Sequence, residues 1–557
     1  MLRFQDSLPR LPVPQLNETM ERYLKSLKAL LSADEFQFSK SAVEVFIQPG
    51  GIGENLQAQL EIMASDPATP NWLHTWWNET AYLAPRIPVV PYVSYFYSYR
   101  DDRRRKRAVH RAAAIASQAL HFQHLVESKE LEPEYMRGEP ISMDSYVYMF
   151  HGCRIPSSGI DQTVTYKPAK YRHFVVCRKG RFFKVPYAKD GLALSVSEIE
   201  AQLKQVYEVV ADTHGIGLGA LTSANRDLWA RARSKLLGLS KRNSVSLETI
   251  QSAAFTLCLD DAAPITLEER AHQYWHGDGQ NRWFDKPLNF IINDNGAAGF
   301  LGEHSMMDGM LTHRLNHTIC SELAKPKSDM SSETVHVGLP YPSEVLFDVD
   351  DELAAMIRQA KEAFHDIIEQ HELRVQPYQA YGKGLIKQFK ASPDAFVQLI
   401  IQLAYYKMFG INRPTYESAA TRKFQKGRTE ACRSVSEESV KFCQVMEDPS
   451  KSKQECITSA KAALKGHVQY ISDASNGHGV DRHLFALKKL LGSAELPPIF
   501  SDPAYTYSST WFLSTSQLSS GHFNGYGWSQ VVDAGFGIAY MVRCLASMSN
   551  AFLDQRK

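Results

Sequence analysis

Segments of strand-like and helix-like periodicity alternate along nearly the whole chain, and this alternation restricts the possible folds most. The apolar runs of residues 171–187 flank a Lys179-Gly180 turn, and those that follow Pro287 flank an Asn295-Gly296 turn. Both patterns predict β-hairpins. Apolar residues recur at helix spacing in four other segments, which are 18–31, 196–210, 350–372 and 393–409. The expected class is therefore α/β or α+β.

Several further segments have less regular patterns. Residues 85–99 alternate prolines with Val, Tyr and Phe, which predicts extended structure. The basic run at 103–107 (RRRKR) predicts a solvated helix start, with a phosphate-binding patch as the less frequent alternative. The charged stretch 434–465 is expected to be helical and exposed. Near the C-terminus, STWFLSTS and FGIAYMV are typical of strands.

Size and charge narrow the possible functions. A chain of 557 residues is too long for one ordinary core, so we expect at least two domains. The chain has 62 Lys and Arg residues against 61 Asp and Glu, so nothing global indicates nucleic acid as a partner. Any anion must therefore be bound by a local cluster of basic side chains.

Cysteine usage and hydropathy predict an intracellular protein. The eight cysteines are scattered without a C-x-x-C pair, which favours reduced thiols. The sequence contains no run of about 18 apolar residues, so no transmembrane segment is expected. The N-terminus has no apolar signal-peptide core, and the last three residues do not form a peroxisomal tripeptide. We expect the cytoplasm, or the mitochondrion or peroxisome if an alternative terminus supplies a signal.

The segment GEHSMMDG at 302–309 carries the best candidate for acid–base chemistry. His304 is followed four residues later by Asp308, and this spacing can bring both side chains to one side of a turn. A neutral imidazole, with an ordinary pKa of about 6.5, can take a proton from an alcohol or a thiol. The chain has 19 histidines, so the pattern alone favours a structural role.

Three other patterns each allow two interpretations. Lys383, Lys387 and Lys390 have the spacing of one helical face, which is either solvated or a seat for a phosphorylated ligand. Residues 514–517 (STSQ) are either an exposed strand end or a set of oxyanion donors. The pairs His272/His276 and His313/His317 have the spacing of zinc ligands. They lack a third ligand nearby, so no metal is expected.

Together these segments resemble the carnitine/choline acyltransferase family over nearly the whole chain. The similar blocks occur in family order: LPRLPVPQL, NWLHTWWNETAYL, GALTSANRDLWA, NRWFDKPLNF, GEHSMMDG, SPDAFVQLIIQLAYY, TYESAATRKFQKGRTEACRS, GVDRHLFALKKL and FLSTSQ. EHSMMDG and GYGWSQVV are most similar to fungal members that transfer acetyl groups. The resemblance implies two domains of similar topology, each a mixed sheet flanked by helices, with an active-site tunnel between them. The implied boundaries are 70–345 for the catalytic-histidine domain, and 1–69 plus 346–557 for the substrate-binding domain.

The resemblance also implies a mechanism without an acyl-enzyme. His304 is then the general base that deprotonates the hydroxyl of carnitine, or the coenzyme A thiol in reverse, for direct attack at the acyl carbonyl. Asp308 matches an acidic position of the family, and Ser516 matches the hydroxyl that donates to the tetrahedral oxyanion. Coenzyme A is a substrate here, and no cofactor is expected.

Ligand contacts are implied residue by residue. For carnitine they are Tyr416, Thr429 and Arg482 on the carboxylate, Ser514 nearby, and Trp77, Tyr82 and Trp528 on the trimethylammonium side. For coenzyme A they are Lys383 and Lys387 on phosphate, with Asp394 and Gln517 near the same ligand. Tyr526 matches a position where a bulky side chain closes the acyl pocket to long chains, so the expected substrates are carnitine and short-chain acyl-CoA, as in acetyl shuttling linked to fatty acid metabolism.

The C-terminus departs from the family pattern. The tail CLASMSNAFLDQRK does not resemble the family's tail, and the chain is shorter there than the family norm. Two alternatives therefore stay open. One is a different specificity within the family, either medium-chain or choline-type, although Arg482 favours carnitine. The other is a weakly active binding protein with an altered C-terminus. The sequence predicts no oligomeric state.

Overall fold

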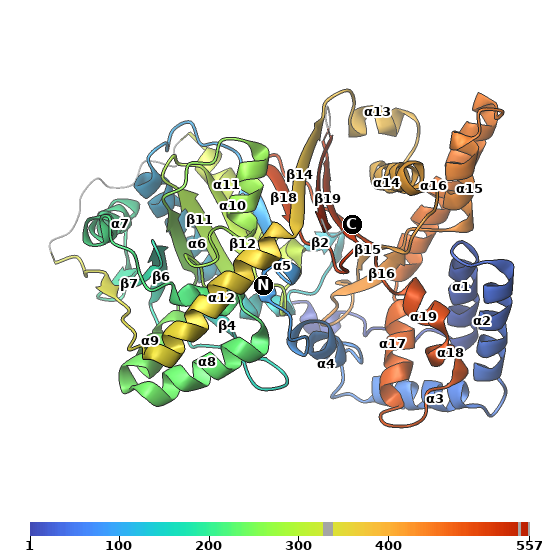
Figure 1. The fold of residues 1–557 in the computed structure, drawn as a ribbon, viewed down its shortest axis with the longest axis horizontal. Helices are drawn as coiled ribbons and strands as arrows, with labels where there is room; N and C mark the ends of the chain where they lie inside the picture. Colours follow the sequence, from blue (N-terminus) through green and yellow to red (C-terminus); the bar gives the residue numbers. More distant parts are fainter. Residues whose placement is uncertain (327–337, 544–546, 555–557) are drawn as a thin grey trace.

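The fold consists of two lobes, each built on one mixed β-sheet with helices packed against it (Figure 1). The computed structural model describes residues 1–326, 338–543 and 547–554. The expected class is therefore confirmed. In these described residues, no helix is both long enough and apolar enough to cross a membrane.

The first lobe contains an eight-stranded sheet with the order β13-β7-β6-β10-β11-β12-β1-β18. Its strands are β1 (Tyr95–Tyr99), β6 (His173–Arg178), β7 (Arg181–Pro186), β10 (Thr256–Asp260), β11 (Leu288–Asn293), β12 (Ala298–Gly302), β13 (Ser343–Glu344) and β18 (Phe523–Trp528). Strands β6, β10 and β11 are parallel, and the other pairings are antiparallel. The hairpins β6–β7 and β11–β12 confirm both predicted hairpins.

Helices cover both faces of this sheet. They are α6 (Ala108–Glu127), α7 (Val196–Val210), α8 (Arg226–Leu239), α9 (Lys241–Gln251), α10 (Leu267–Trp275), α11 (Gly309–Ala324) and α12 (Asp351–Glu369), with the short 3₁₀ helix η4 (Leu218–Ser223). Alternate residues of β6 enter different cores: Phe174 and Val176 join one, Val175 and Cys177 the other. The continuous apolar run of this strand follows from its burial on both faces.

The second lobe contains a six-stranded sheet with the order β14-β20-β19-β17-β15-β16. Its strands are β14 (His371–Tyr378), β15 (Thr415–Ala420), β16 (Thr429–Arg433), β17 (Leu513–Gln517), β19 (Phe536–Val542) and β20 (Ser547–Asp554). Three neighbouring strands, β15, β17 and β19, are parallel. The accompanying helices are α13 (Lys383–Gln388), α14 (Pro393–Phe409), α15 (Glu437–Glu447) and α16 (Lys453–Ser475). Each lobe thus has three parallel strands flanked by antiparallel ones.

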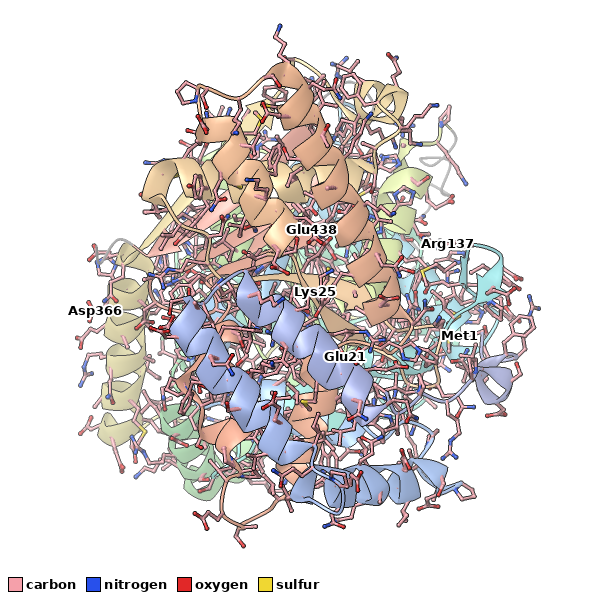
Figure 2. All side chains as sticks on the ribbon, turned by 90° about the vertical axis from the view of Figure 1, so that its right-hand side faces the viewer. Met1, Glu21, Lys25, Arg137, Asp366 and Glu438 are labelled. Atoms are coloured by element: carbon pink, nitrogen blue, oxygen red, sulfur yellow. The ribbon has the colours of Figure 1, made fainter. Side chains whose placement is uncertain are left out.

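The N-terminal helices pack against the C-terminal half of the chain. They are α1 (Leu16–Lys28), α2 (Ala33–Phe46) and α3 (Ile52–Ser65), which share a core with α17 (Asp481–Leu490), α18 (Pro498–Ser501) and α19 (Pro503–Ser508). Figure 2 shows α1 and α2 lying side by side across this end of the molecule, where Lys25 pairs with Glu438 at 3.5 Å.

Short elements connect these layers. Near the lobe contact lie α4 (His74–Trp77), the π-helical segment η2 (Asn78–Leu83) and α5 (Val89–Tyr92). The remaining ones are η1 (Gln5–Ser7), η3 (Asp144–Tyr148), β2 (Tyr135–Met136), β3 (Glu139–Pro140), β4 (Gly152–Ile155), β5 (Gln162–Thr165), β8 (Ala188–Lys189) and β9 (Leu192–Ala193).

Two parts of the C-terminal half belong physically to the first lobe. Strand β18 pairs with β1 and so extends the first sheet. Helix α12 packs against α8 and η4. The boundary between residues 345 and 346 stays a prediction.

Several local predictions are wrong in part. Residues 89–92 form a helical turn, and only 95–99 are a strand in the segment expected to be extended. Arg105 of the basic run is buried and not solvated. Its guanidinium donates to Asp102 and to the carbonyl of Leu323, and these bonds make burial of the charge possible. The lysine stripe is broken, because α13 ends at Gln388 and Lys390 has a φ of 55°. The helix predicted over 350–372 ends at Glu369.

Candidate active site

His304 lies just after the end of β12, at the contact between the two lobes. Its ring is stacked on Tyr82, with 5.1 Å between ring centroids, and meets the ring of Tyr95 edge-on at 5.1 Å. Burial lowers the pKa of His304 below its ordinary value, and the nearby carboxylate of Asp308 only partly opposes this. His304 is therefore neutral at physiological pH, as a proton acceptor must be.

An arginine of the second lobe fixes the segment that carries His304. Arg428 donates to the carbonyl of Ser305 at 2.6 Å and to the carbonyl of His304 at 3.0 Å. It also pairs with Asp308 at 2.8 Å. Burial works against ionisation of Asp308, but Arg428 outweighs it and holds the pKa of this carboxyl below its ordinary value.

Asp308 acts on His304 through space and not through a hydrogen bond. The distance from His304 Nδ1 to Asp308 Oδ1 is 3.8 Å, which is too long for one. The main partner of Asp308 is Arg428, which sequence reasoning missed. The available signal was a basic residue directly before Thr429, inside a block already assigned to the carnitine site.

Strand β17 presents alternate hydroxyls to opposite faces of the second sheet. Ser514 accepts from Trp528 Nε1 at 3.3 Å, and Ser516 Oγ lies 3.3 Å from Ser418 Oγ. Thr515 faces the other way and donates to the carbonyl of Tyr416 at 2.7 Å. Because side chains alternate along a strand, Ser514 and Ser516 share one face.

The remaining carnitine candidates surround Arg482, which is buried. Its guanidinium carbon lies 3.4 Å from the ring centroid of Trp77, and its Nε donates to the carbonyl of Thr429 at 3.2 Å. Tyr416 lies beside Ser514 across the β15–β17 ladder, and burial raises the pKa of its phenol. The structure thus brings four candidates together, and the ring of Trp77 lies against the guanidinium of Arg482. They are Trp77, Arg482, Thr429 and Tyr416.

The two tyrosines that contact His304 lead toward Arg482 and toward Ser514. Tyr82 contacts Trp77 edge-on at 6.4 Å, which leads to Arg482. Tyr95 is the register partner of Trp528 in the β1–β18 pair, which leads to Ser514.

Tyr526 is almost fully buried and joins the two sheets. Its hydroxyl donates to the carbonyl of Ser516 at 2.5 Å and accepts from the N–H of Leu518 at 2.7 Å. Its ring lies 6.3 Å from Tyr97 and 5.8 Å from Trp528, measured between centroids. The side chain therefore fills space and also fixes the end of β17.

The coenzyme A candidates are less concentrated. Lys383 and Lys387 lie on α13, with Lys387 exposed. Gln517 donates to Ser519 Oγ at 2.8 Å. Asp394 is partly buried at the start of α14 and accepts from the phenol of Tyr540 at 2.7 Å.

Asp394 belongs to a buried polar cluster that sequence reasoning missed. Burial and the neighbouring Glu417 raise the pKa of Asp394 to about 7, and burial raises that of Glu417 to about 7. Glu417 pairs with His467 Nε2 at 2.9 Å. In the described part of the chain, Glu417, Cys432 and His467 are the one trio whose possible metal-ligand atoms lie within 4.8 Å of one another.

The histidine pairs are occupied by local hydrogen bonds. His272 Nδ1 and His276 Nε2 lie 3.0 Å apart, and His276 Nδ1 lies 2.7 Å from the carbonyl of Gly277. His317 Nδ1 lies 3.0 Å from Ser520 Oγ. The seven described cysteines are free, and Cys544 lies outside the described residues.

Comparisons with known proteins give one consistent result. The family described as choline/carnitine O-acyltransferase matches residues 11–548. A mitochondrial carnitine O-acetyltransferase from Saccharomyces cerevisiae is 39% identical, covering 97% of this chain and 82% of that protein. A carnitine O-acetyltransferase from Columba livia is 36% identical, covering 96% and 87%. A peroxisomal carnitine O-octanoyltransferase from Bos taurus is 31% identical, covering 97% and 91%.

Proposed function

Because the chain belongs to the choline/carnitine O-acyltransferase family, we propose that it reversibly transfers short acyl groups, above all acetyl, between coenzyme A and L-carnitine. One observation carries the proposal. The partly exposed, neutral His304 contacts the ring of Tyr82, which leads through Trp77 to Arg482. It also contacts the ring of Tyr95, whose strand partner Trp528 donates to the Ser514 hydroxyl. A cation able to pair with a carboxylate and a serine hydroxyl are thus linked to a base through these rings, and carnitine acylation requires these groups.

In this mechanism His304 takes the proton of the carnitine hydroxyl as its oxygen attacks the carbonyl carbon of acetyl-CoA. The hydroxyl of Ser516 donates to the oxyanion that forms. When the tetrahedral intermediate collapses, the carbon–sulfur bond breaks and the protonated His304 returns the proton to the departing thiolate. The reverse reaction uses the same groups, and Asp308 with Arg428 holds the segment of His304 throughout.

Substrate binding follows from charge. Arg482, with Tyr416 and Thr429, pairs with the carboxylate of carnitine. The trimethylammonium end of carnitine is then next to Trp528, Tyr82 and Ser514, because an aromatic face attracts such a cation. Lys383 and Lys387 take the phosphate of coenzyme A, with Asp394 and Gln517 nearby. A compartment such as the mitochondrion or peroxisome accords with the names of two relatives.

The second candidate is transfer of medium-chain acyl groups, which the octanoyltransferase relative keeps open. The bulk of Tyr526, buried beside Ser516, favours short chains. Choline as acceptor is disfavoured, because it has no carboxylate to pair with the buried Arg482.

The decisive assay follows thiol release from acetyl-CoA with carnitine, next to octanoyl-CoA as donor and choline as acceptor. We expect His304→Ala to lose activity by at least about a hundredfold, the size of general-base effects, while coenzyme A binding measured by calorimetry persists. A wild-type protein that binds coenzyme A but releases no thiol would support the inert binding variant. Preference for octanoyl-CoA would support the second candidate.

A further inference from the structure

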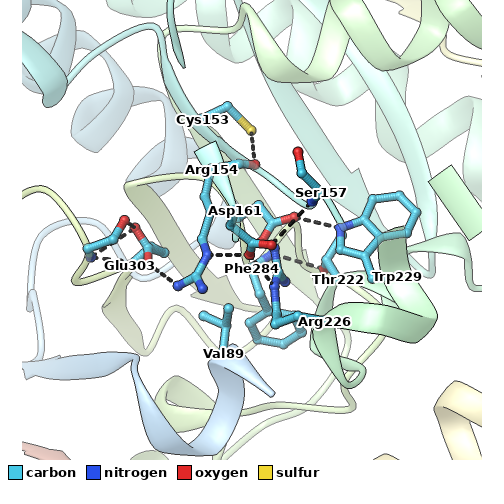
Figure 3. Close-up of polar contacts among 12 residues, drawn as sticks. Val89, Cys153, Arg154, Ser157, Asp161, Thr222, Arg226, Trp229, Phe284 and Glu303 are labelled. Atoms are coloured by element: carbon cyan, nitrogen blue, oxygen red, sulfur yellow. Dashed lines mark hydrogen bonds and ion pairs between the residues drawn. The ribbon is translucent and has the colours of Figure 1, made fainter. Parts of the chain in front are cut away.

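Inside the first lobe lies a buried cluster of charged side chains that includes Glu303, the residue before His304 (Figure 3). Its members share an exposure of 5% or less and are Arg154, Asp161, Arg226, Asp285 and Glu303. Such charges are retained in a protein interior only when they are paired and hydrogen-bonded. None of the chemical steps proposed above uses this cluster, so its role requires a separate explanation.

Arg154, on β4, makes a different contact with each of its three nitrogens. Its Nε donates to Asp161 at 2.8 Å, Nη1 to the carboxylate of Glu303 at 3.3 Å, and Nη2 to the backbone carbonyl of Tyr82 at 2.8 Å. A guanidinium is planar and rigid, so it fixes the three partners relative to one another. Figure 3 shows its side chain extending between Asp161 and Glu303.

Two of these partners directly adjoin the proposed base. Glu303 precedes His304 in the chain, and its carboxylate accepts from Ser305 Oγ at 2.6 Å and from the Ser305 N–H at 3.1 Å. Glu303 therefore fixes the backbone on both sides of His304. Tyr82 is the residue whose ring stacks on the imidazole.

Arg154 thus holds the chain segment of His304 and the segment of the ring against it in one frame. Arg428 reaches the same backbone from the second lobe. The two arginines act on one short segment from opposite lobes. A small displacement of a reacting group can cost about a hundredfold in rate, so such a frame has catalytic value.

We infer that Arg154 is a positioning residue for the base: through Glu303 and the Tyr82 carbonyl it sets the place and orientation of the His304 imidazole. The inference rests on the proposed function, because it gives a role to a neighbour of the proposed base. Arg154 does not touch substrate in this account, and it acts only through its two partners.

Arg226 provides a matched control. It is as buried as Arg154 and pairs with the same carboxylate, Asp161, at 2.6 Å. Its other ion pair is with Asp285 at 2.9 Å. Arg154→Lys and Arg226→Lys therefore make the same chemical change in one cluster, but only the first breaks the contacts to Glu303 and Tyr82.

The test compares both variants with wild type in the acetyl-CoA and carnitine assay, over pH 5.5 to 8.5. For Arg154→Lys we expect kcat to fall by roughly tenfold or more, with both KM values within about threefold of wild type. The acidic limb of its pH profile should shift to higher pH, because a loosened, better-hydrated His304 regains an ordinary pKa near 6.5. Arg226→Lys should keep kcat within about threefold and leave the limb in place.

Glu303→Gln keeps the inference testable if Arg154→Lys does not fold. It leaves the Arg154–Asp161 pair intact and removes the negative charge through which Glu303 binds both Arg154 and Ser305, so it should shift the acidic limb in the same direction. Equal losses in Arg154→Lys and Arg226→Lys without a shift of the limb would overturn the inference. So would wild-type kinetics in Glu303→Gln. Inactive wild type would instead refute the proposed function.

Discussion

At the scale of single residues, the site depends on charges taken out of water and then paired. Arg428 and Arg482 are both buried, and each lies against an aromatic face. Arg428 donates to two backbone carbonyls, and Arg482 donates to one through its Nε. Arg428 is fully committed to Asp308 and the backbone around His304. Within the described residues the Arg482 guanidinium forms no ion pair, and burial raises the pKa of Glu430, which accepts from the Arg482 backbone N–H, to about 7. Arg482 is thus the arginine of the pair suited to an anionic substrate.

We therefore predict that Arg482→Asn raises the KM for carnitine far more than the KM for acetyl-CoA. The lost ion pair with a buried carboxylate is worth roughly 2–5 kcal/mol. Steady-state kinetics with each substrate varied in turn measures this. Arg413→Asn is a suitable control, because Arg413 stacks on Phe512 at 4.9 Å and has no proposed ligand. An equal rise in both KM values would mean that Arg482 supports the fold around Trp77.

At the scale of elements, β18 has two functions. It completes the first sheet beside β1, although in the sequence it lies between β17 and β19 of the second lobe. Through the hydroxyl of Tyr526 it also holds the end of β17, where Ser516 lies. The acyl-pocket candidate is thus part of the connection between the sheets.

Tyr526→Gly should shift preference toward longer acyl chains. Each methylene group that enters the freed space adds about 0.8 kcal/mol of binding. The measurement is the ratio of kcat/KM for octanoyl-CoA to that for acetyl-CoA. Tyr526→Phe separates the two roles, because it removes the hydroxyl and keeps the ring. We expect the ratio to rise in the Gly variant and stay near wild type in the Phe variant. An unchanged ratio in the Gly variant would assign the pocket limit to another residue.

The docking of the N-terminal helices should be sensitive to acid. His483 on α17 contacts Thr19 of α1 at 2.8 Å and Gln57 of α3 at 2.9 Å, and burial lowers its pKa to about 3. The unfolded chain binds a proton there below about pH 6.5, and the folded chain does not. Stability from this residue is therefore present above pH 6.5 and lost as the pH falls toward 3.

His483→Gln should remove that dependence. Between pH 7.5 and pH 5, wild type should lose roughly 2 kcal/mol more of its free energy of unfolding than the variant. Urea denaturation at both pH values measures the difference. His365→Gln, at a solvent-exposed histidine of α12, should behave as wild type. A His483→Gln variant with the wild-type slope would contradict the assignment.

At the scale of the whole molecule, buried ion pairs join the two lobes around the site. Arg428 with Asp308 is one. Another is Arg422, which follows β15 and binds Glu134 of the first lobe through two bonds of 3.0 Å. Arg422 also donates to the carbonyl of Ser142 at 2.7 Å. Residues of both lobes must therefore keep one relative position for the site to exist.

Arg422→Gln should destabilise the protein by roughly 1.5–3 kcal/mol, because it removes the charged bonds to the largely buried carboxylate of Glu134, which among the described residues keeps only Arg314 at 3.5 Å as an ion-pair partner. Arg3→Gln breaks the neighbouring pair with Glu132, whose side chains are 58% and 77% exposed, and should cost less than about 1 kcal/mol. Chemical denaturation of both variants provides the comparison. Similar stabilities would show that the Arg422 pair does not hold the lobes together.

The sequence by itself determined the elements with strong periodicity and the ordered blocks. The hairpins, the helix at 196–210 and the strands β17 and β19 follow from the local apolar pattern, because burial of one face requires that pattern wherever the element lies. His304 was also identifiable, because its segment matches a sequence motif of the family. The break in the lysine stripe could not be predicted, because the spacing of the lysines does not show that Lys390 has a positive φ.

Only the tertiary structure decided which distant residues meet. Arg428 at Asp308, Arg154 at Glu303, and β18 in the first sheet each join segments more than a hundred residues apart in sequence. The local apolar pattern does not identify such partners, because the sequence alone does not distinguish a buried arginine from a solvated one. Its partner is fixed by the packing of whole lobes, and the desolvation of His304 that keeps it neutral is a product of that packing.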